Sequence, residues 1–89
     1  MVDRKLTIHY SEVPQDLQIA AVERAAGLIE SKKPDNEIAK DLKRAFDAQY
    51  HPQWHCVVGR HFGAYVSNEE QKVLYFTYGQ TSILLFKAG

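Results

Sequence analysis

The chain has 89 residues, with 11 basic and 11 acidic side chains, so its formal charge at pH 7 is zero. That length suffices for one domain over residues 1–89, and a hydrophobic content of 45% indicates a folded rather than a disordered protein. A neutral chain lacks the long-range attraction to phosphate on which nucleic-acid-binding proteins rely, so nucleic acid is not an expected partner.

The sequence also bears on where the protein resides. Its single cysteine, Cys56, cannot form an internal disulfide, which favours a reducing compartment. Residues 1–5 are not followed by the apolar segment of a signal peptide, and the apolar run at residues 83–86 is too short to cross a membrane. We therefore expect a cytoplasmic protein without a membrane partner.

A strand and a helix are predicted at the start of the chain. Residues 5–10 alternate between apolar and polar side chains, as a half-buried strand does. The apolar face of this strand carries Leu6, Ile8 and Tyr10. Pro14 suits the first position of a helix, which is predicted over residues 14–31. The apolar stripe of that helix consists of Leu17, Ala21, Ala25, Leu28 and Ile29.

A second helix is predicted over residues 34–50. Pro34 suits its first position, and Asp35 and Glu37 fall in its first turn, where the helix dipole favours carboxylates. The helix is expected to end before Pro52, because the residue preceding a proline avoids helical angles. Its buried side is expected to contain Ile38, Leu42, Ala45, Phe46 and either Gln49 or Tyr50.

The last third of the chain changes to an alternation of period two, which predicts strands. These strands are expected at residues 54–58, 62–67, 72–78 and 81–86. Gly79 and Gln80 form a predicted two-residue hairpin, with glycine first as a type II′ turn requires. The predicted order is β-α-α-β-β-β-β. It describes an α+β domain in which two helices pack on one face of an antiparallel sheet.

Four side chains invite a metal or catalytic interpretation: His51, His55, Cys56 and His61. Zinc ligands usually come in closely spaced pairs, and Pro52 prevents His51 and His55 from sharing a helical face. His55 and Cys56 are neighbours in a strand, so they point to opposite faces, and Cys56 shares its face with core residues. We expect no metal, no cofactor and no catalysis. A small Cys56–His55 enzyme is kept as the alternative.

A sheet rich in aromatic side chains is also typical of RNA-binding platforms, which combine the rings with a basic rim. Such a rim is not predicted here. The basic pairs Lys32–Lys33 and Lys43–Arg44 are interpreted as solvated helix faces. Packing of the rings in a core or an interface is therefore the favoured interpretation.

The strand predicted at residues 62–67 carries small side chains, Gly63 and Ala64. A small residue within a strand lets another backbone approach closely, so an edge strand of this kind accepts an added strand from a partner. An ordinary bulge or bend explains the same residues equally well. The pattern alone leaves both interpretations open.

Residues 50–66, YHPQWHCVVGRHFGAYV, resemble the signature of the eight-kilodalton cytoplasmic dynein light chains. Residues 3–5, 75–76, 79–80 and 83–87 resemble the same family. The resemblance covers the whole chain without gaps, and residues 11–33 are its most divergent part.

The resemblance implies a non-catalytic homodimeric adaptor of the dynein motor complex. The strand at residues 62–67 would leave its own subunit and pair with residues 54–58 of the partner, which creates two grooves at the dimer interface. Short motifs such as Thr-Gln-Thr, from the dynein intermediate chain and other proteins, would bind there as an added antiparallel strand. The implied location is the cytoplasm, on the microtubule cytoskeleton.

The family's functional positions carry over residue by residue. The peptide-binding positions correspond to Asp35, Asn36, Arg60, His61, Phe62, Gly63, Ala64, Tyr65, Val66, Ser67, Asn68, Val73, Tyr75, Thr77, Ser82 and Leu84. The dimer-interface positions correspond to Lys43, His55, Val57, Tyr65 and Ser67.

Several groove positions depart from the commonest family pattern. Asn36, Asn68, Val73, Thr77 and Ser82 stand where a lysine, a histidine, an aromatic residue, a tyrosine and an alanine are usual. These changes predict a roomier and less selective pocket for the client threonine. They also favour the alternative of a specialised or axonemal light chain with other clients. A serine is usual at the position of Ala88, so phosphorylation there is not expected.

Overall fold

Two helices and four strands make up the part of the chain that the structure, a computed structural model, describes: residues 5–50, 53–60 and 72–87. The elements are β1 (Leu6–Ser11), α1 (Gln15–Glu30), α2 (Asp35–Tyr50), β2 (Trp54–Arg60), β3 (Val73–Tyr78) and β4 (Thr81–Lys87). The predicted α+β architecture, with two helices on an antiparallel sheet, is confirmed. The strand predicted at residues 62–67 lies outside the described residues.

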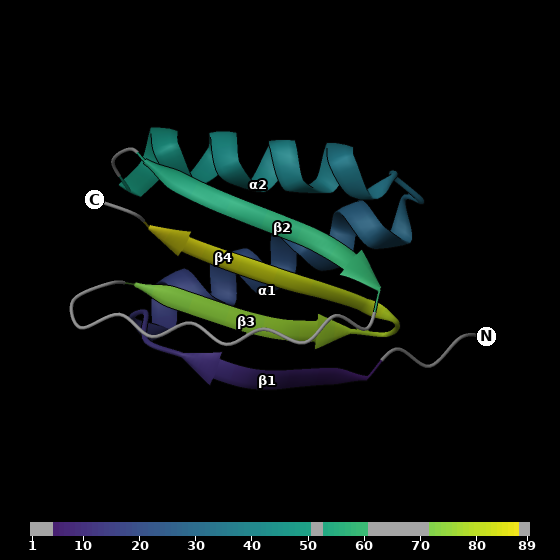
Figure 1. The fold of residues 1–89 in the computed structure, drawn as a ribbon, viewed down its shortest axis with the longest axis horizontal. Helices are drawn as coiled ribbons and strands as arrows, with labels where there is room; N and C mark the ends of the chain where they lie inside the picture. Colours follow the sequence, from purple (N-terminus) through teal and green to yellow (C-terminus); the bar gives the residue numbers. More distant parts are fainter. Residues whose placement is uncertain (1–4, 51–52, 61–71, 88–89) are drawn as a thin grey trace.

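The sheet has the strand order β1-β3-β4-β2, and all of its described pairs are antiparallel. β1 and β2 therefore lie at its two edges (Figure 1). A two-residue turn joins β3 to β4, because Tyr78 pairs directly with Thr81. Gly79 takes a φ of 64° at the first turn position, which is the left-handed value that a type II′ turn requires. The predicted hairpin is confirmed.

Both helices begin one residue after the proline that predicted them. The carbonyl oxygens of Pro14 and Pro34 accept hydrogen bonds from the amides of Gln18 and Ile38, so each proline stands at the N-terminal boundary. α2 ends at Tyr50, as expected. Neither described helix combines the length and the hydropathy that crossing a membrane requires.

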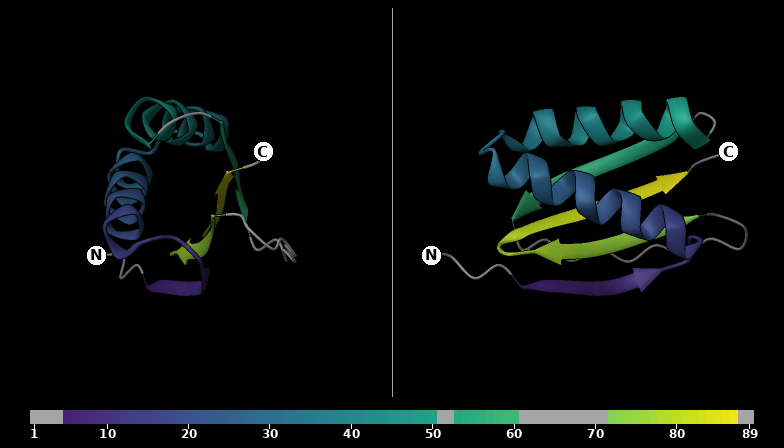
Figure 2. Two further views of the ribbon diagram at one scale, coloured as in Figure 1. Left: turned by 90° about the vertical axis from the view of Figure 1, so that its left-hand side faces the viewer. Right: turned by 180° about the vertical axis from the view of Figure 1, so that it is seen from behind.

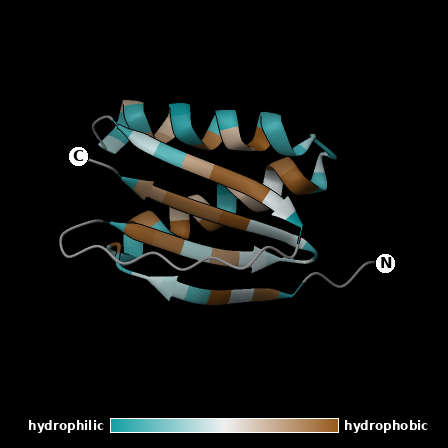
Figure 3. Cartoon of the chain, viewed as in Figure 1, coloured by the Kyte–Doolittle hydropathy of each residue, from teal (hydrophilic) through white to brown (hydrophobic). Residues whose placement is uncertain are grey.

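The helices cover one face of the sheet, as the end-on view in Figure 2 shows. The buried core between the two layers consists of Leu17, Ala21, Ala25, Ile29, Ile38, Leu42, Phe46, Trp54, Leu74, Phe76, Ile83 and Leu85. The predicted stripes of both helices supply seven of these residues, while Leu28 and Tyr50 pack against the core in part. Hydrophobic residues accordingly follow the central strands, whereas the outward side of α2 is hydrophilic (Figure 3).

The predicted apolar face of β1 is partly wrong. Leu6 and Tyr10 are 43% and 44% exposed, and only Ile8 of the three packs against the core. A bulge at His9 shifts the register, so that Tyr10 pairs with Tyr75 and takes the opposite face. Ser11 then points to the helices, where its hydroxyl donates to Gln18 of α1 at 2.7 Å.

A non-glycine residue in the left-handed conformation ends α1. Lys32 has a φ of 61°, and its amide donates to the carbonyl of Ile29, while the amide of Lys33 donates to that of Leu28. This pair of hydrogen bonds is the Schellman motif, whose left-handed position is usually glycine. A Cβ at that position costs about 1 kcal/mol, and glycine would remove this strain.

We therefore expect Lys32→Gly to raise the free energy of unfolding by up to about 1 kcal/mol, the gain being reduced by the greater freedom of glycine in the unfolded chain. Thermal denaturation would measure the change. Lys33→Gly, at a position without a positive φ, is the matched control and should destabilise the protein or leave its stability unchanged. A lower melting temperature for Lys32→Gly than for the wild type would contradict the prediction.

Candidate functional site

The face of the sheet turned away from the helices, here called the outer face, brings together the described groove residues of β3 and β4. Cross-strand partners share a face, and successive residues of a strand alternate between faces. Leu84 lies between Tyr75 and Val57 in one row of the outer face, and Ser82 lies beside Thr77 in the next. The same alternation places Val73 next to Phe86. Val73, Ser82 and Leu84 are buried although they face away from both helices.

A polar row crosses this outer face. The imidazole Nε2 of His9 lies 2.7 Å from the hydroxyl of Thr77, and that hydroxyl lies 3.4 Å from the hydroxyl of Ser82. The ring of His9 also packs on Tyr75, with centroids 4.8 Å apart. Sequence reasoning missed His9. The alternation along β1 did place it opposite Ile8, but its position beside Thr77 depends on the pairing of β1 with β3.

A cavity of about 460 Å³ lies along the edge strand β2, and it is called the edge cavity below. It is lined by Ala39, Lys40, Lys43, Trp54, His55, Cys56, Val57 and Phe86. The imidazole of His55 stacks on the ring of Phe86 at a centroid distance of 5.3 Å, and Val57 is 47% exposed. The predicted interface residues Lys43, His55 and Val57 are thus brought together beside a strand whose described partner is β4 alone.

Asp47 links α2 to the start of β2. One carboxylate oxygen accepts the backbone N–H of Trp54 at 2.7 Å, and the other pairs with the ammonium of Lys43. The hydrogen bond from Lys43, followed by that from Trp54, holds the pKa of Asp47 below its ordinary value of 3.8. This carboxylate therefore fixes Lys43 on the wall of the edge cavity and ties the helix to the edge strand.

The lowered pKa of Asp47 predicts an acid-dependent contribution to stability. The unfolded chain binds the proton more readily, so the contribution is present above pH 3.8 and is lost as the pH falls through the folded-state pKa. We expect Asp47→Asn to be less stable than the wild type at pH 7 and to show a flatter loss of stability below pH 3.8. Urea denaturation from neutral to acidic pH would test this. Lys43→Met removes one of the two hydrogen bonds to Asp47, so its loss of stability should lie between those of the wild type and Asp47→Asn. The prediction would be refuted if the free energy of unfolding of Asp47→Asn and of the wild type fell in parallel as the pH is lowered.

Cys56 does not have the environment of a nucleophile. Its side chain packs against the core, and burial raises its pKa from 9.0 to about 12. His55 is its neighbour in β2, so the imidazole points to the opposite face of the sheet. The alternative of a Cys56–His55 pair therefore has no support in the geometry.

We expect the thiol of Cys56 to react with Ellman's reagent about a thousandfold more slowly in the folded protein than in urea, since a rise in pKa from 9.0 to about 12 lowers the thiolate fraction by that factor. The reaction would be followed by absorbance at mildly alkaline pH. Labelling of the folded protein at the rate of the unfolded chain would show that the thiol is accessible and ionised.

Three further groove positions lie at one end of the molecule. Asp35 and Asn36 are exposed in the first turn of α2, and Arg60 is exposed at the end of β2. Figure 1 shows that α2 begins and β2 ends on the same side of the fold. Helix N-termini present free backbone N–H groups, which suits an acceptor on a ligand.

The other predicted site residues lie outside the described residues. They are His61, Phe62, Gly63, Ala64, Tyr65, Val66, Ser67 and Asn68, together with Ala88. His51, which was weighed as a metal ligand, is also outside them. Within residues 5–50, 53–60 and 72–87, His, Cys, Asp and Glu side chains form no group of three or more that could hold a metal ion.

Fold and site together define a class: a small two-layer α+β domain with an exposed edge strand and an outer sheet face lined by apolar and aromatic side chains. The family model "Dynein light chain type 1" matches residues 5–88. A dynein light chain of Schistosoma mansoni is 42% identical over 89 residues, which is the full length of both chains. The chain belongs to the dynein light chain family.

Solved structures share the fold at lower identity. The dynein light chain-like domain of the Fasciola hepatica calcium-binding protein FhCaBP2 has a TM-score of 0.85 at 21% identity, covering 98% of this chain and 94% of that one. The corresponding domain of CsTAL3 has a TM-score of 0.75 at 12% identity, covering 93% and 92% of the two chains. At these identities the likeness concerns the fold alone.

Proposed function

We propose that the protein is a non-catalytic, homodimeric adaptor of the dynein motor complex, located in the cytoplasm on the microtubule cytoskeleton. Each dimer binds two extended segments of partner proteins, among them the dynein intermediate chain and other proteins with Thr-Gln-Thr-like motifs. Each segment is added as an antiparallel strand in a groove at the dimer interface. Family membership supports the association with dynein.

One observation carries the adaptor proposal: β2 is an edge strand with exposed apolar surface and a cavity beside it. An edge strand presents unpaired N–H and C=O groups that template the addition of another strand. Val57 is 47% exposed in the middle of β2, next to the edge cavity of about 460 Å³. Proteins rarely leave such an edge uncovered. A second subunit that covers this edge would supply hydrogen bonds to the backbone groups and would remove the apolar side chains from water.

The test combines oligomeric state with peptide geometry. Sedimentation equilibrium should show a dimer at micromolar concentration near neutral pH. A labelled Thr-Gln-Thr peptide should bind with a dissociation constant in the micromolar range, about −8 kcal/mol, by fluorescence anisotropy. Proline in the middle of the peptide should abolish binding, because it removes a ladder hydrogen bond. The same peptide presented on a dimeric scaffold should bind about a hundredfold more tightly.

Either of two results would reject the adaptor. A protein that sediments only as a monomer lacks the paired grooves. A dimeric peptide that binds no better than a monomeric one shows that two sites do not act together.

The polar row on the outer face favours a second candidate, a specialised light chain with altered clients. His9, Thr77 and Ser82 form a row of hydrogen-bonding groups on the outer face, in which Thr77 and Ser82 stand where a tyrosine and an alanine are usual in the family. Val73 leaves more room than an aromatic ring would. Peptides substituted at the client threonine would decide the matter, since the altered pocket should accept larger residues there. A strong retained preference for threonine would favour the ordinary client set.

A further inference from the structure

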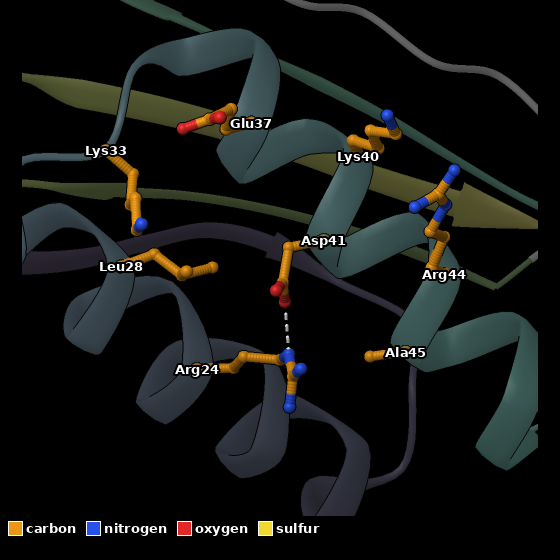
Figure 4. Close-up of a pocket in the computed structure, with 8 residues that line it drawn as sticks. All are labelled: Arg24, Leu28, Lys33, Glu37, Lys40, Asp41, Arg44 and Ala45. Atoms are coloured by element: carbon orange, nitrogen blue, oxygen red, sulfur yellow. Dashed lines mark hydrogen bonds and ion pairs between the residues drawn. The ribbon is translucent and has the colours of Figure 1, made fainter.

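A second cavity lies between the two helices, on the side of the molecule away from the sheet (Figure 4). Its volume is about 510 Å³, and it is called the helical cleft below. It is lined by Arg24 and Leu28 of α1, Lys33 of the connecting turn, and Glu37, Lys40, Asp41, Arg44 and Ala45 of α2. None of the proposed peptide-binding residues lines the helical cleft, although the groove positions Asp35 and Asn36 lie next to it in the first turn of α2.

The helical cleft concentrates positive charge in a neutral protein. Its lining has four cations and two carboxylates, a net charge of two, whereas the whole chain has a formal charge of zero. Arg24 and Asp41 form an ion pair across the cleft. Lys33, Lys40 and Arg44 form no ion pair with any described residue.

The fold holds two of these cations together at a cost. Lys40 and Arg44 are four residues apart on α2, so they are neighbours on its surface. A like-charged pair at this spacing destabilises a helix. Figure 4 shows both side chains pointing away from α1, so an anion bound beside them on α2 would reduce this repulsion. Leu28 of α1 and Ala45 of α2 add apolar surface to this charged lining.

We propose that the helical cleft binds an acidic peptide segment of a partner protein, with carboxylates on both sides of an apolar side chain. The carboxylates would neutralise the net charge of two, and the apolar side chain would contact Leu28 and Ala45. Glu37 and Asp41 limit the net charge of the lining to two, which suits a few carboxylates better than the dense phosphates of nucleic acid or of an anionic membrane. This site goes beyond the proposed adaptor function, because its lining contains none of the proposed peptide-binding residues and shares only Lys40 with the edge cavity.

The probe is a fluorescein-labelled peptide, Glu-Glu-Leu-Glu-Glu, titrated with the full-length protein and followed by anisotropy. We expect saturable binding that weakens about tenfold or more when the salt is raised from about 0.02 M to about 0.3 M. Gln-Gln-Leu-Gln-Gln should not bind. The double variant Lys33→Glu/Arg44→Glu should weaken binding at least about tenfold.

The matched control is Lys5→Glu/Lys72→Glu, which makes the same change in net charge at two exposed lysines away from the cleft. It should bind the peptide like the wild type, and circular dichroism should show that both double variants are folded. An unlabelled Thr-Gln-Thr peptide should not displace the probe, so this result does not depend on the adaptor groove.

Four results with the peptides and the variants overturn the proposal: no binding of the glutamate peptide, equal binding of the glutamine peptide, equal loss in both double variants, or displacement by Thr-Gln-Thr. Competition with phosphate ligands gives a fifth. If duplex DNA or anionic vesicles of phosphatidylserine displace the probe at lower concentration than the unlabelled glutamate peptide does, the cleft is a phosphate site. The proposal of an acidic protein partner is then wrong.

Discussion

Replacing Phe46 with alanine is expected to lower the free energy of unfolding by about 3–5 kcal/mol. Phe46 is 2% exposed at the centre of the contact between α2 and the sheet. Its ring meets Trp54 edge-on at a centroid distance of 5.2 Å and also packs on Tyr50 at 5.0 Å. Alanine would leave a cavity and remove both aromatic contacts, each of which contributes about 0.5–1.5 kcal/mol beyond the buried area.

This loss is large for a domain of 89 residues, whose total stability is expected to be about 5–13 kcal/mol. Urea denaturation at a fixed protein concentration would measure it, because the proposed dimerisation would make stability depend on concentration. Ile19→Ala is the matched control: Ile19 is 48% exposed on α1, so its truncation should change stability by about 0.5 kcal/mol or less. If Phe46→Ala unfolded at the same urea concentration as Ile19→Ala, the position of Phe46 in the core would be refuted.

The helices were predictable because their signals are local. Pro14 and Pro34 mark the N-terminal boundaries, and the spacing of Leu17, Ala21 and Ala25 shows which side of α1 is buried. The alternation of β1 failed beyond Ile8, because the bulge at His9 arises from pairing with β3, a contact between distant parts of the chain. The alternation of apolar and polar residues along a strand cannot indicate such a shift of register.

The two candidate sites differ in how much of each could be predicted from the sequence. The resemblance supplied Val73, Tyr75 and Leu84, and the antiparallel register then placed them on one face. The helical cleft could not be predicted. Lys33 and Arg44 were interpreted as solvated residues of separate helix faces, since no pattern shows that the packing of α1 against α2 brings them beside Arg24.

A lysine in place of His55 is expected to prevent dimerisation at neutral pH, with a rise in the dimer dissociation constant of about a hundredfold or more, or about 2.8 kcal/mol. His55 stacks on Phe86 beside the exposed Val57, and the edge cavity that they line already contains Lys40 and Lys43. Covering this edge with a second subunit would bury a new ammonium group among apolar side chains and near Lys40, while Asp47 already pairs with Lys43. A twofold axis would repeat that cost in both subunits.

Sedimentation equilibrium of wild type, His55→Lys and two controls would measure the effect. His55→Gln keeps a neutral side chain of similar size and should remain dimeric. Ala48→Lys adds the same charge at an exposed position of α2 outside the edge cavity, and it should also remain dimeric. Binding of the Thr-Gln-Thr peptide should fall together with dimerisation in His55→Lys, because each proposed groove needs residues from both subunits. A His55→Lys protein that dimerises like Ala48→Lys would place the subunit interface away from the edge cavity.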